Sequence, residues 1–300
     1  MLVFKNVIVY RIGAGWSATL AEMEDRLNAT RFVDCGPSQE KSSGWVEPRG
    51  VAQGPLVESV GGQWVLKMMV ETRALPASVV NRKADERVAQ IEASTGRKPG
   101  KKEMRDLKDD IRLTLLPMAF TKLASMTVWI DREAGWLVID AASQSRAEEV
   151  VAALVAALDG FAITLLNTQI SPTAAMAQWL DTQEPPAGFS VDRECELKAA
   201  DESRAVVRYA RHALDTEEVR QHVAAGKLPT RLALTWEGRV SFVLTESLQL
   251  KKLAFLEGVF ETSGAERADG FDADVAIATG ELRKLLPDLI EALGGEVLVA

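Results

Sequence analysis

The sequence predicts an α+β fold with antiparallel sheets, flanking helices and a projecting helical hairpin. Two observations lead to this class. Segments rich in β-branched and apolar residues mostly follow one another through short turns, as the strands of antiparallel sheets do. The stretch 76–117 differs, because apolar residues recur in it at helical spacing on both sides of a basic turn with two glycines and a proline. We expect this hairpin to project from the sheets.

Composition narrows the functional classes. The 300-residue chain has a formal net charge of −8 and a pI near 5.1, so nucleic acid is not the partner that composition suggests first. Net charge governs the far field, however, whereas binding depends on local charge. The two cysteines, Cys35 and Cys195, suit a reducing cytoplasm and give no disulfide framework or zinc cluster. The N-terminal stretch is too short and too quickly polar for a signal peptide or a membrane span, which predicts a cytoplasmic protein without membrane contact.

The region before the hairpin predicts two strands and one helix. A β-branched strand, 3–12, ends at two glycines, and Ser17 then caps a helix. Residues 35–62 are rich in glycine, proline and serine and are predicted mostly as loop, with Trp45 and Val46 as a short extended piece. A second strand, 64–73, leads into the hairpin.

The hairpin is predicted as two helices joined by the turn 95–100. Ser78 is the expected N-cap of the first helix, along which apolar residues recur every three or four positions. The second helix is expected from Lys101 to Leu116, where Pro117 closes it.

The part after the hairpin mixes strands and helices. Ser145 and Ser171 are the expected caps of two helices, and a proline follows the second cap at the first turn. Residues 181–188, with two consecutive prolines, are the best candidate for a linker. A helix capped by Thr216 and a final helix that starts at Thr279 are also expected. The predicted strands are 122–131, 135–141, 161–166, 189–197, 205–210, 231–236, 239–245, 248–255 and 274–278.

These elements group into three expected domains. Residues 1–75 and 118–180 form a central α+β domain, 76–117 form the hairpin tip, and 181–300 form a C-terminal α+β base domain. The linker candidate separates the first of these from the last.

The second helix of the hairpin sorts its residues into three sectors at about 100° per residue. Apolar residues form one stripe and acidic residues a second sector, while cations recur at spacings of four, three and four. A solvated surface hairpin with scattered ion pairs is one interpretation. The other is a basic ridge, about 24 Å long, that lies along a phosphate backbone. The cations of this helix and its preceding turn are Arg97, Lys98, Lys101, Lys102, Arg105, Lys108 and Arg112.

A second basic region lies between Arg204 and Arg239. Arg204 and Arg208 have even spacing in an expected strand, so they should share one face. Arg211 and two histidines belong to the same region. A solvated sheet face is the alternative interpretation, but two basic regions in an acidic protein favour one charge-segregated surface.

Signals for catalysis are weak. His212 and His222 have no cysteine or serine motif beside them, and no nucleophile-elbow, zinc-protease, phosphate-loop or dinucleotide motif occurs. An acidic group near the final helix is a poor metal candidate, because such carboxylates more often cap backbone donors. It comprises Asp269, Asp272, Asp274 and Glu281. The seven tryptophans fit core packing better than base stacking. We therefore expect no enzyme, no cofactor and no metal.

Several blocks of the sequence together resemble one family. They are the opening FKNVIVYRI, GWVEP, LLPMAF, the pair WID and VIDAAS, LALTW, and FDADVAIATGEL followed by LIEALGGE. In this order they span nearly the whole chain and resemble the bacterial recombination-associated RdgC family. The resemblance implies a non-enzymatic, ring-shaped homodimer with a positively charged hole wide enough for a duplex. It also implies DNA binding largely without sequence preference and restraint of RecA-promoted strand exchange.

The resemblance and the charge pattern together give the expected contacts. Phe120 lies in the matching LLPMAF block and is the expected dimer contact, with core packing as its alternative. Arg208 and Arg211 join the hairpin cations as expected DNA contacts, although this chain has Ala210 where the family tends to be more polar. The expected partners are double-stranded DNA, with single-stranded DNA as a second form, a second copy of the chain, and RecA as the antagonised recombinase, at the nucleoid.

Two alternatives stay open at this point. The first is a protein-interaction module that acts on the recombinase itself, with DNA contact secondary. The second is a metal-dependent nuclease, which nicking in the presence of magnesium or manganese alone would identify.

Overall fold

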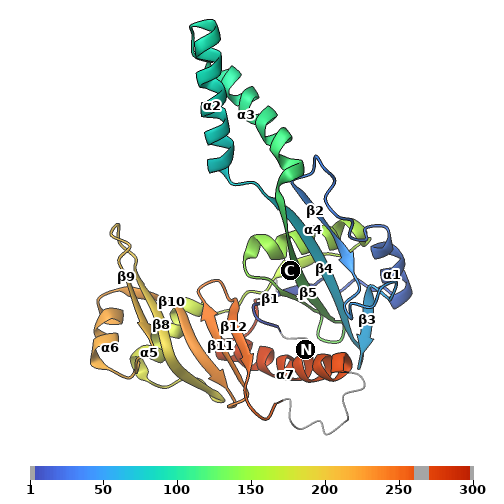
Figure 1. Cartoon of the computed structure of the whole chain (residues 1–300). Coiled ribbons are helices and arrows are strands. Elements are labelled where there is room, and N and C mark those ends of the chain that lie inside the picture. Colours follow the sequence, from blue (N-terminus) through green and yellow to red (C-terminus); the bar gives the residue numbers. More distant parts are fainter. Residues whose placement is uncertain (1–3, 260–269, 298–300) are drawn as a thin grey trace. The chain divides into compact units, whose positions relative to one another are not determined.

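The computed structural model describes residues 4–259 and 270–297, which form mixed α+β structure with a large antiparallel sheet (Figure 1). The predicted class is therefore confirmed. By its internal contacts the chain divides into two units. The larger unit comprises residues 1–26, 47–66 and 126–300, and the hairpin unit comprises residues 27–46 and 67–125. The three-domain division stays a prediction.

Strands dominate the larger unit, and two of them, of 12 residues each, continue into the hairpin unit. The strands are β1 (Val7–Ile12), β3 (Val57–Val60), β4 (Gln63–Ala74), β5 (Phe120–Asp131), β6 (Trp136–Asp140), β7 (Ile163–Leu165), β8 (Phe189–Ala199), β9 (Val206–Ala210), β10 (Lys227–Trp236), β11 (Val240–Thr245) and β12 (Leu250–Phe255). Neighbours pair antiparallel in the order β6-β1-β12-β11-β10-β8-β9, and β7 also pairs with β1. A short hairpin joins β3 to the first part of β4, and the end of β5 pairs with β6.

Helices cover one face of the β8–β12 part of this sheet. They are α5 (Pro172–Thr182), α6 (Glu217–Ala224) and α7 (Gly270–Ala292). Their apolar residues share one buried cluster with Leu232 and Leu234 of β10. Because side chains alternate along a strand, Arg231 and Thr235 lie on the opposite face. We call this surface of β8 to β12 the sheet face.

The core also explains two other features. α4 (Gln144–Ala157) packs beside β6, and its Gln144 amide donates to the hydroxyl of Tyr10 on β1 (2.9 Å). Six of the seven tryptophans are buried, which confirms core packing as their role; they are Trp45, Trp64, Trp129, Trp136, Trp179 and Trp236.

The hairpin unit contains a strand pair and a helix pair. Its elements include β2 (Lys41–Val46), α2 (Ala77–Thr95), α3 (Lys101–Leu115) and a 3₁₀ turn (Leu116–Met118). β2 pairs with the second part of β4, and the chain then passes through α2 and α3 before it returns into β5 (Figure 1). α2 buries Val80 and Ala84, whereas α3 buries none of its residues. The expected helix pair is confirmed, and it has little core of its own.

The structure corrects three predicted helix starts. α1 (Leu20–Asn28) begins after Thr19, because Thr19 and Glu22 exchange hydrogen bonds in which the Glu22 N–H reaches the threonine hydroxyl and the Thr19 N–H reaches the carboxylate. Ser17 is therefore not the cap. Ser171 caps α5 as expected, since its hydroxyl accepts from a backbone N–H (3.3 Å). The other corrected starts follow Pro76 instead of Ser78 and Ser143 instead of Ser145.

Two further predictions are wrong. The strand expected at 274–278 and the helix start expected at Thr279 belong to one continuous helix, α7. The Thr279 hydroxyl donates to the Val275 carbonyl inside that helix (2.7 Å), so it does not cap a new start. The region 35–62, expected mostly as loop, contains β2 and β3, which pair with β4. The short extended piece expected at Trp45 and Val46 is the end of β2.

Candidate nucleic-acid interface

One carboxylate holds the turn at the tip of the hairpin. α2 ends at Gly96, whose φ of 70° is the left-handed conformation that glycine adopts readily. α3 starts after Gly100, whose N–H donates to Glu103 (2.8 Å). Two guanidinium nitrogens of Arg97 also donate to Glu103, at 2.8 and 2.7 Å. These hydrogen bonds, from Arg97 first and then Gly100, lower the pKa of Glu103 to about 2, so the carboxylate is ionised at neutral pH.

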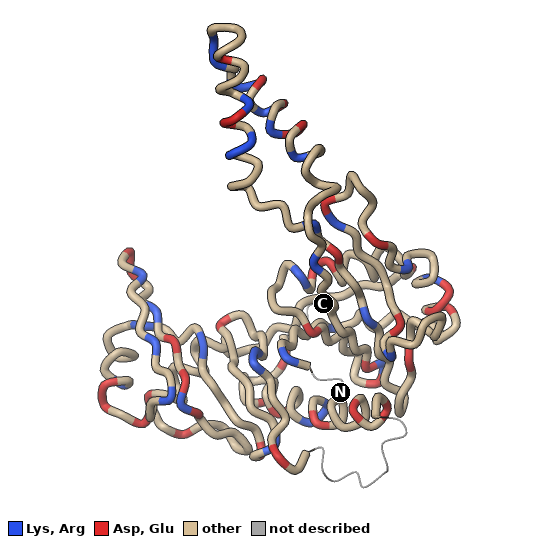
Figure 2. Tube along the Cα trace, in the orientation of Figure 1, with Lys and Arg blue, Asp and Glu red and all other residues tan. Residues whose placement is uncertain are grey.

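The cations of the hairpin turn and α3 fall into two groups by their ion pairs, and Figure 2 shows how Lys and Arg are distributed along the two helices. Three are engaged by carboxylates at nitrogen–oxygen distances between 2.7 and 3.8 Å: Arg97 with Glu103, Lys98 with Glu92, and Arg112 with both Glu40 and Asp109. The other four make no ion pair among the residues that the structure describes. We call them the ridge cations; they are Lys101, Lys102, Arg105 and Lys108. A free cation exchanges its counterions for phosphate without first breaking an internal pair.

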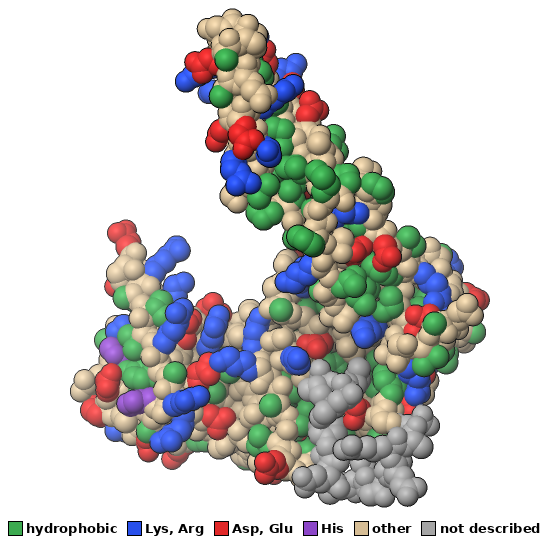
Figure 3. Space-filling view, viewed as in Figure 1, with side chains coloured by type: hydrophobic (Ala, Val, Ile, Leu, Met, Phe, Trp, Pro, Cys, Tyr) green, Lys and Arg blue, Asp and Glu red, His purple; other side chains and the backbone are tan. Residues whose placement is uncertain are grey.

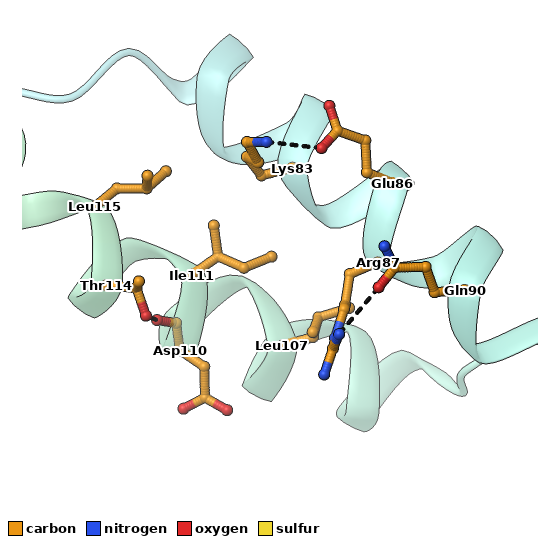
Figure 4. Close-up of a pocket in the computed structure, with 9 residues that line it drawn as sticks. All are labelled: Lys83, Glu86, Arg87, Gln90, Leu107, Asp110, Ile111, Thr114 and Leu115. Carbon is orange, nitrogen blue, oxygen red and sulfur yellow. Dashed lines mark hydrogen bonds and ion pairs between the residues drawn. The ribbon is translucent and has the colours of Figure 1, made fainter.

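A groove of about 450 Å³ runs between α2 and α3 (Figure 4). On the α2 side, Lys83 pairs with Glu86 (2.8 Å) and Arg87 donates to Gln90 (2.9 Å). On the α3 side the groove is mainly apolar, and the side chains that face α2 there are Leu107, Ile111 and Leu115. The apolar stripe predicted on α3 therefore lies half-buried against α2, and this leaves the ridge cations at the surface.

The sheet face carries a second group of cations, but here a carboxylate stands between them. Glu196 on β8 is in direct register with Arg208 on β9 and with Arg231 on β10. The Arg208 Nε donates to Glu196 (2.5 Å). Arg231 is exposed and makes no ion pair in the described part of the chain. Of this cross-strand row, Arg231 is thus the cation that is free.

Two lysines of β12 add to the cations of the sheet face. Figure 3 shows Lys and Arg side chains gathered over this part of the molecule. Lys251 donates to a backbone carbonyl (2.5 Å), and its pKa is lowered by burial and by the nearby charge of Arg231. Lys252 pairs with Glu194 of β8 (2.5 Å). Two like charges that lie close enough to affect each other favour an anion between them. We call Arg208, Arg231, Lys251 and Lys252 the sheet cations.

The structure separates the cations that the sequence placed on one strand. Arg204 lies outside β9 with a φ of 46°, so it does not share a strand face with Arg208, and that prediction is wrong. Arg211 follows the end of β9 with a φ of 56° and is exposed. The two histidines make local contacts: His212 Nδ1 lies 2.6 Å from a backbone carbonyl, and Lys227 Nζ lies 2.7 Å from His222 Nδ1.

Two of the acidic residues singled out near α7, Asp272 and Glu281, are used in ion pairs. Arg49 donates to Asp272 (2.5 Å), and Arg239 makes two bonds to Glu281 (2.8 and 2.6 Å). Asp269 lies outside the described residues. Within the described ranges, no group of three or more histidine, cysteine or acidic side chains is placed to hold a metal ion.

Comparison with known proteins places the chain in a family. A family model described as "Putative exonuclease, RdgC" matches residues 2–296. The chain belongs to the RdgC family. A "Recombination-associated protein RdgC" from Dechloromonas aromatica is 48% identical, with 99% of each chain covered. Proteins of the same name from Herminiimonas arsenicoxydans and Cupriavidus pinatubonensis are 43% and 45% identical, each with 98% of both chains covered. The resemblance seen in the sequence blocks is confirmed.

An exposed apolar group lies at the foot of the hairpin, in the block that matched the RdgC family. Phe120 is 88% exposed, so core packing within the chain is not its role. Met118 is 71% exposed, and Leu113 and Leu123 exceed half exposure as well. Apolar side chains gather at this level of the hairpin surface (Figure 3). Apolar groups of this kind mark interaction sites more often than they serve a monomer.

Sequence reasoning missed part of the sheet face. Lys251 and Lys252 stand in a strand and were not associated with the region 204–239, because their register with β11 is set by the fold. The signal in the sequence was the pair of consecutive lysines in the predicted strand 248–255, which follows the basic region. None of the helices in the described part of the chain has the length and apolarity needed to cross a lipid bilayer.

Proposed function

We propose that this protein binds duplex DNA by the phosphate backbone, largely without sequence preference. The ridge cations carry the proposal, because they are mostly exposed, free of carboxylates and spaced along one helix. Phosphate contacts fix a protein on DNA without reading its bases. The sheet cations and Arg211 support a second phosphate-binding surface. Arg97, Lys98 and Arg112 contribute less, because each is already engaged.

The proposed role is to cover duplex DNA and so deny it to a RecA-type recombinase during recombination and replication. The shared name of the relatives, recombination-associated protein, supports this role. The protein would act at the nucleoid and would catalyse no reaction. Because the family description names an exonuclease, end-labelled duplex should be incubated with the protein and Mg²⁺ or Mn²⁺. We expect intact DNA; shortening from the ends would replace this proposal by a nuclease.

Salt dependence of binding is the direct test. If about six to eight phosphates are neutralised, log K should fall against log salt with a slope of roughly −5 to −7. The measurement is fluorescence anisotropy of labelled duplex without recombinase, with single-stranded DNA as competitor. Base composition should matter little, because phosphate contacts carry no sequence information. Binding that is insensitive to salt would contradict the proposal. Binding that requires the recombinase would favour the protein-interaction alternative.

A second copy of the chain is the proposed partner, in a ring-shaped homodimer that encircles the duplex. The exposure of Phe120 supports it as a contact residue. A compact monomer of this length has a radius of gyration of roughly 19 Å, and a ring of two must exceed it. We expect solution scattering to show a larger, hollow particle for the protein and a monomer for F120D. The unfolding midpoint of the F120D monomer should stay close to normal; a compact monomer without the substitution would contradict the proposal.

A further inference from the structure

A carboxylate lies between the two arginines of the sheet face, and both of its oxygens are used. Glu196 Oε2 accepts from the Nε of Arg208 (2.5 Å), and Oε1 accepts from the hydroxyl of Thr230 (2.8 Å). Arg208 and Arg231 occupy the strands on either side, each in register with Glu196. Adjacent strands lie about 4.8 Å apart, so the two arginine backbones are about 10 Å from each other with Glu196 midway.

This carboxylate is shielded, whereas its partner is not. The side chain of Glu196 is 15% exposed and that of Arg208 is 73% exposed. The hydrogen bond from Arg208, helped by Thr230 and by the charge of Arg231, outweighs burial and lowers the pKa of Glu196. Glu196 is therefore negative at neutral pH. It neutralises a guanidinium that is otherwise open to solvent.

Two residues earlier on β8, a second glutamate also neutralises a cation, here one from β12, which is not a neighbour of β8 in the sheet. Glu194 pairs with Lys252 (2.5 Å), and residues 194 and 196 share one face of the strand. The two pairs contrast with α3, where the acidic residues lie in a different sector from Lys101, Arg105 and Lys108. Cross-strand ion pairs stabilise a sheet only modestly. On a surface that meets phosphate, however, each such glutamate occupies a position where a phosphate oxygen would otherwise bind.

We infer that Glu196 is an internal competitor of DNA phosphate on the sheet face, an inference that rests on the duplex binding proposed above. A phosphate pairs with Arg208 only after it displaces this carboxylate. The carboxylate also repels a phosphate that approaches Arg231. Glu196 thus weakens the hold of the sheet face on the duplex and speeds its release, while the ridge cations supply the remaining affinity.

The test compares two charge-removing variants. E196Q keeps the shape of the side chain, and one more cation then becomes free to exchange counterions. At 0.15 M salt we expect E196Q to bind duplex about fivefold more tightly, with a salt slope steeper by about one phosphate equivalent. The matched control is E217Q, which removes a carboxylate from Arg220 (3.2 Å) on α6, on the helix-covered side of the sheet. It changes net charge equally and should bind as the unaltered protein does.

Arg208 supplies a second readout. R208Q added to E196Q should remove the gain, because the cation that E196Q sets free is then absent. Circular dichroism and the unfolding midpoint confirm that each variant is folded. Equal or weaker binding by folded E196Q would overturn the inference and leave DNA binding intact. If the unaltered protein binds no duplex, the proposed function and this inference both fall.

Discussion

The ridge on α3 and the sheet face both present cations, but the two surfaces treat them in opposite ways. On α3 the ridge cations make no ion pair with any residue that the structure describes. On the sheet, two glutamates of β8 neutralise cations: Glu196 pairs with Arg208, which is in register with it on β9, and Glu194 pairs with Lys252 of β12. The two surfaces also differ in how they are packed. α3 buries none of its residues, whereas the other face of the sheet packs into a hydrophobic core that includes Leu232, which is 0% exposed.

The comparison shows that the neighbours of a cation decide whether it is available to phosphate. The net charge of −8 neither excludes nor predicts a phosphate-binding surface at either place, because binding depends on local charge. Unpaired cations on a helix without buried residues contribute affinity for phosphate, and changing them should affect the stability of the fold little. Paired cations on a packed sheet give a weaker, more exchangeable contact.

Neutralising the ridge cations should have the largest effect. K101Q/R105Q/K108Q removes three phosphate contacts and keeps residues that form helices well. Each contact contributes about 0.9 to the slope of log K against log salt. Affinity for duplex at 0.1 M salt should therefore fall by several hundredfold, roughly, and the slope should shrink by about three. Fluorescence anisotropy across salt is the measurement.

The engaged cations provide a matched control on the same element. R97Q/K98Q/R112Q removes as many charges, but each cation already has a carboxylate partner, so the loss should stay below about tenfold. Circular dichroism should show both triple variants folded. Equal losses would mean that internal pairing does not decide availability. A folded K101Q/R105Q/K108Q protein with unchanged affinity would move the DNA site to the sheet face.

Core substitutions should separate the two regions by stability. L232A opens a cavity under the sheet and should lower the free energy of unfolding by about 2–5 kcal/mol. I111A trims a half-buried residue of α3 and should lower it by roughly 1 kcal/mol or less. Urea unfolding followed by tryptophan fluorescence and by circular dichroism measures both. A loss from I111A as large as that from L232A would show that the groove beside α2 is covered in solution.

The hairpin was predictable because its signals are local. Two glycines and a proline mark the turn, and the expected start at Lys101 agrees with α3. The charge sectors follow from helical periodicity alone. The roles of Arg97 and Arg112 were not visible, because their partners Glu103 and Glu40 depend on the folded turn and on the start of the strand pair.

The sheet face was less predictable because its pairs depend on register. An irregularity between Pro229 and Arg231 sets which residue of β10 faces Glu196. A left-handed backbone at Arg204 removes that residue from β9, which alternation alone does not indicate. The start of α7 was not predicted for a related reason. Thr279 resembles an N-cap in the sequence, but its hydroxyl donates to the Val275 carbonyl four residues earlier in the same helix. Strand register and the position of a residue inside a helix are set by the tertiary structure and cannot be read from local sequence alone.

The smallest expected effects concern pH, and they fall on opposite sides of neutrality in the two regions. Glu103 has its pKa lowered to about 2 by Arg97, so its contribution is complete above the ordinary value of 4.5 and is lost as pH falls through 2. Cys195 lies under the sheet, where burial and then the charge of Glu196 raise its pKa from 9.0 to about 12. The fold favours the neutral thiol, so this contribution is complete below pH 9 and declines as pH rises toward 12.

Acid should therefore weaken the hairpin turn, and alkali should weaken the sheet. We expect the helical signal of E103Q to match that of the unaltered protein near pH 2 but to be lower near pH 5, because only the ionised carboxylate binds Arg97 and Gly100. For C195A the decline of stability between pH 9 and 11 should be shallower than for the unaltered protein, even if the variant is less stable at pH 7. Circular dichroism and urea unfolding across pH measure both. If C195A declined as steeply as the unaltered protein, the alkaline loss would belong to other groups, and the thiol would not mark the difference between the two regions.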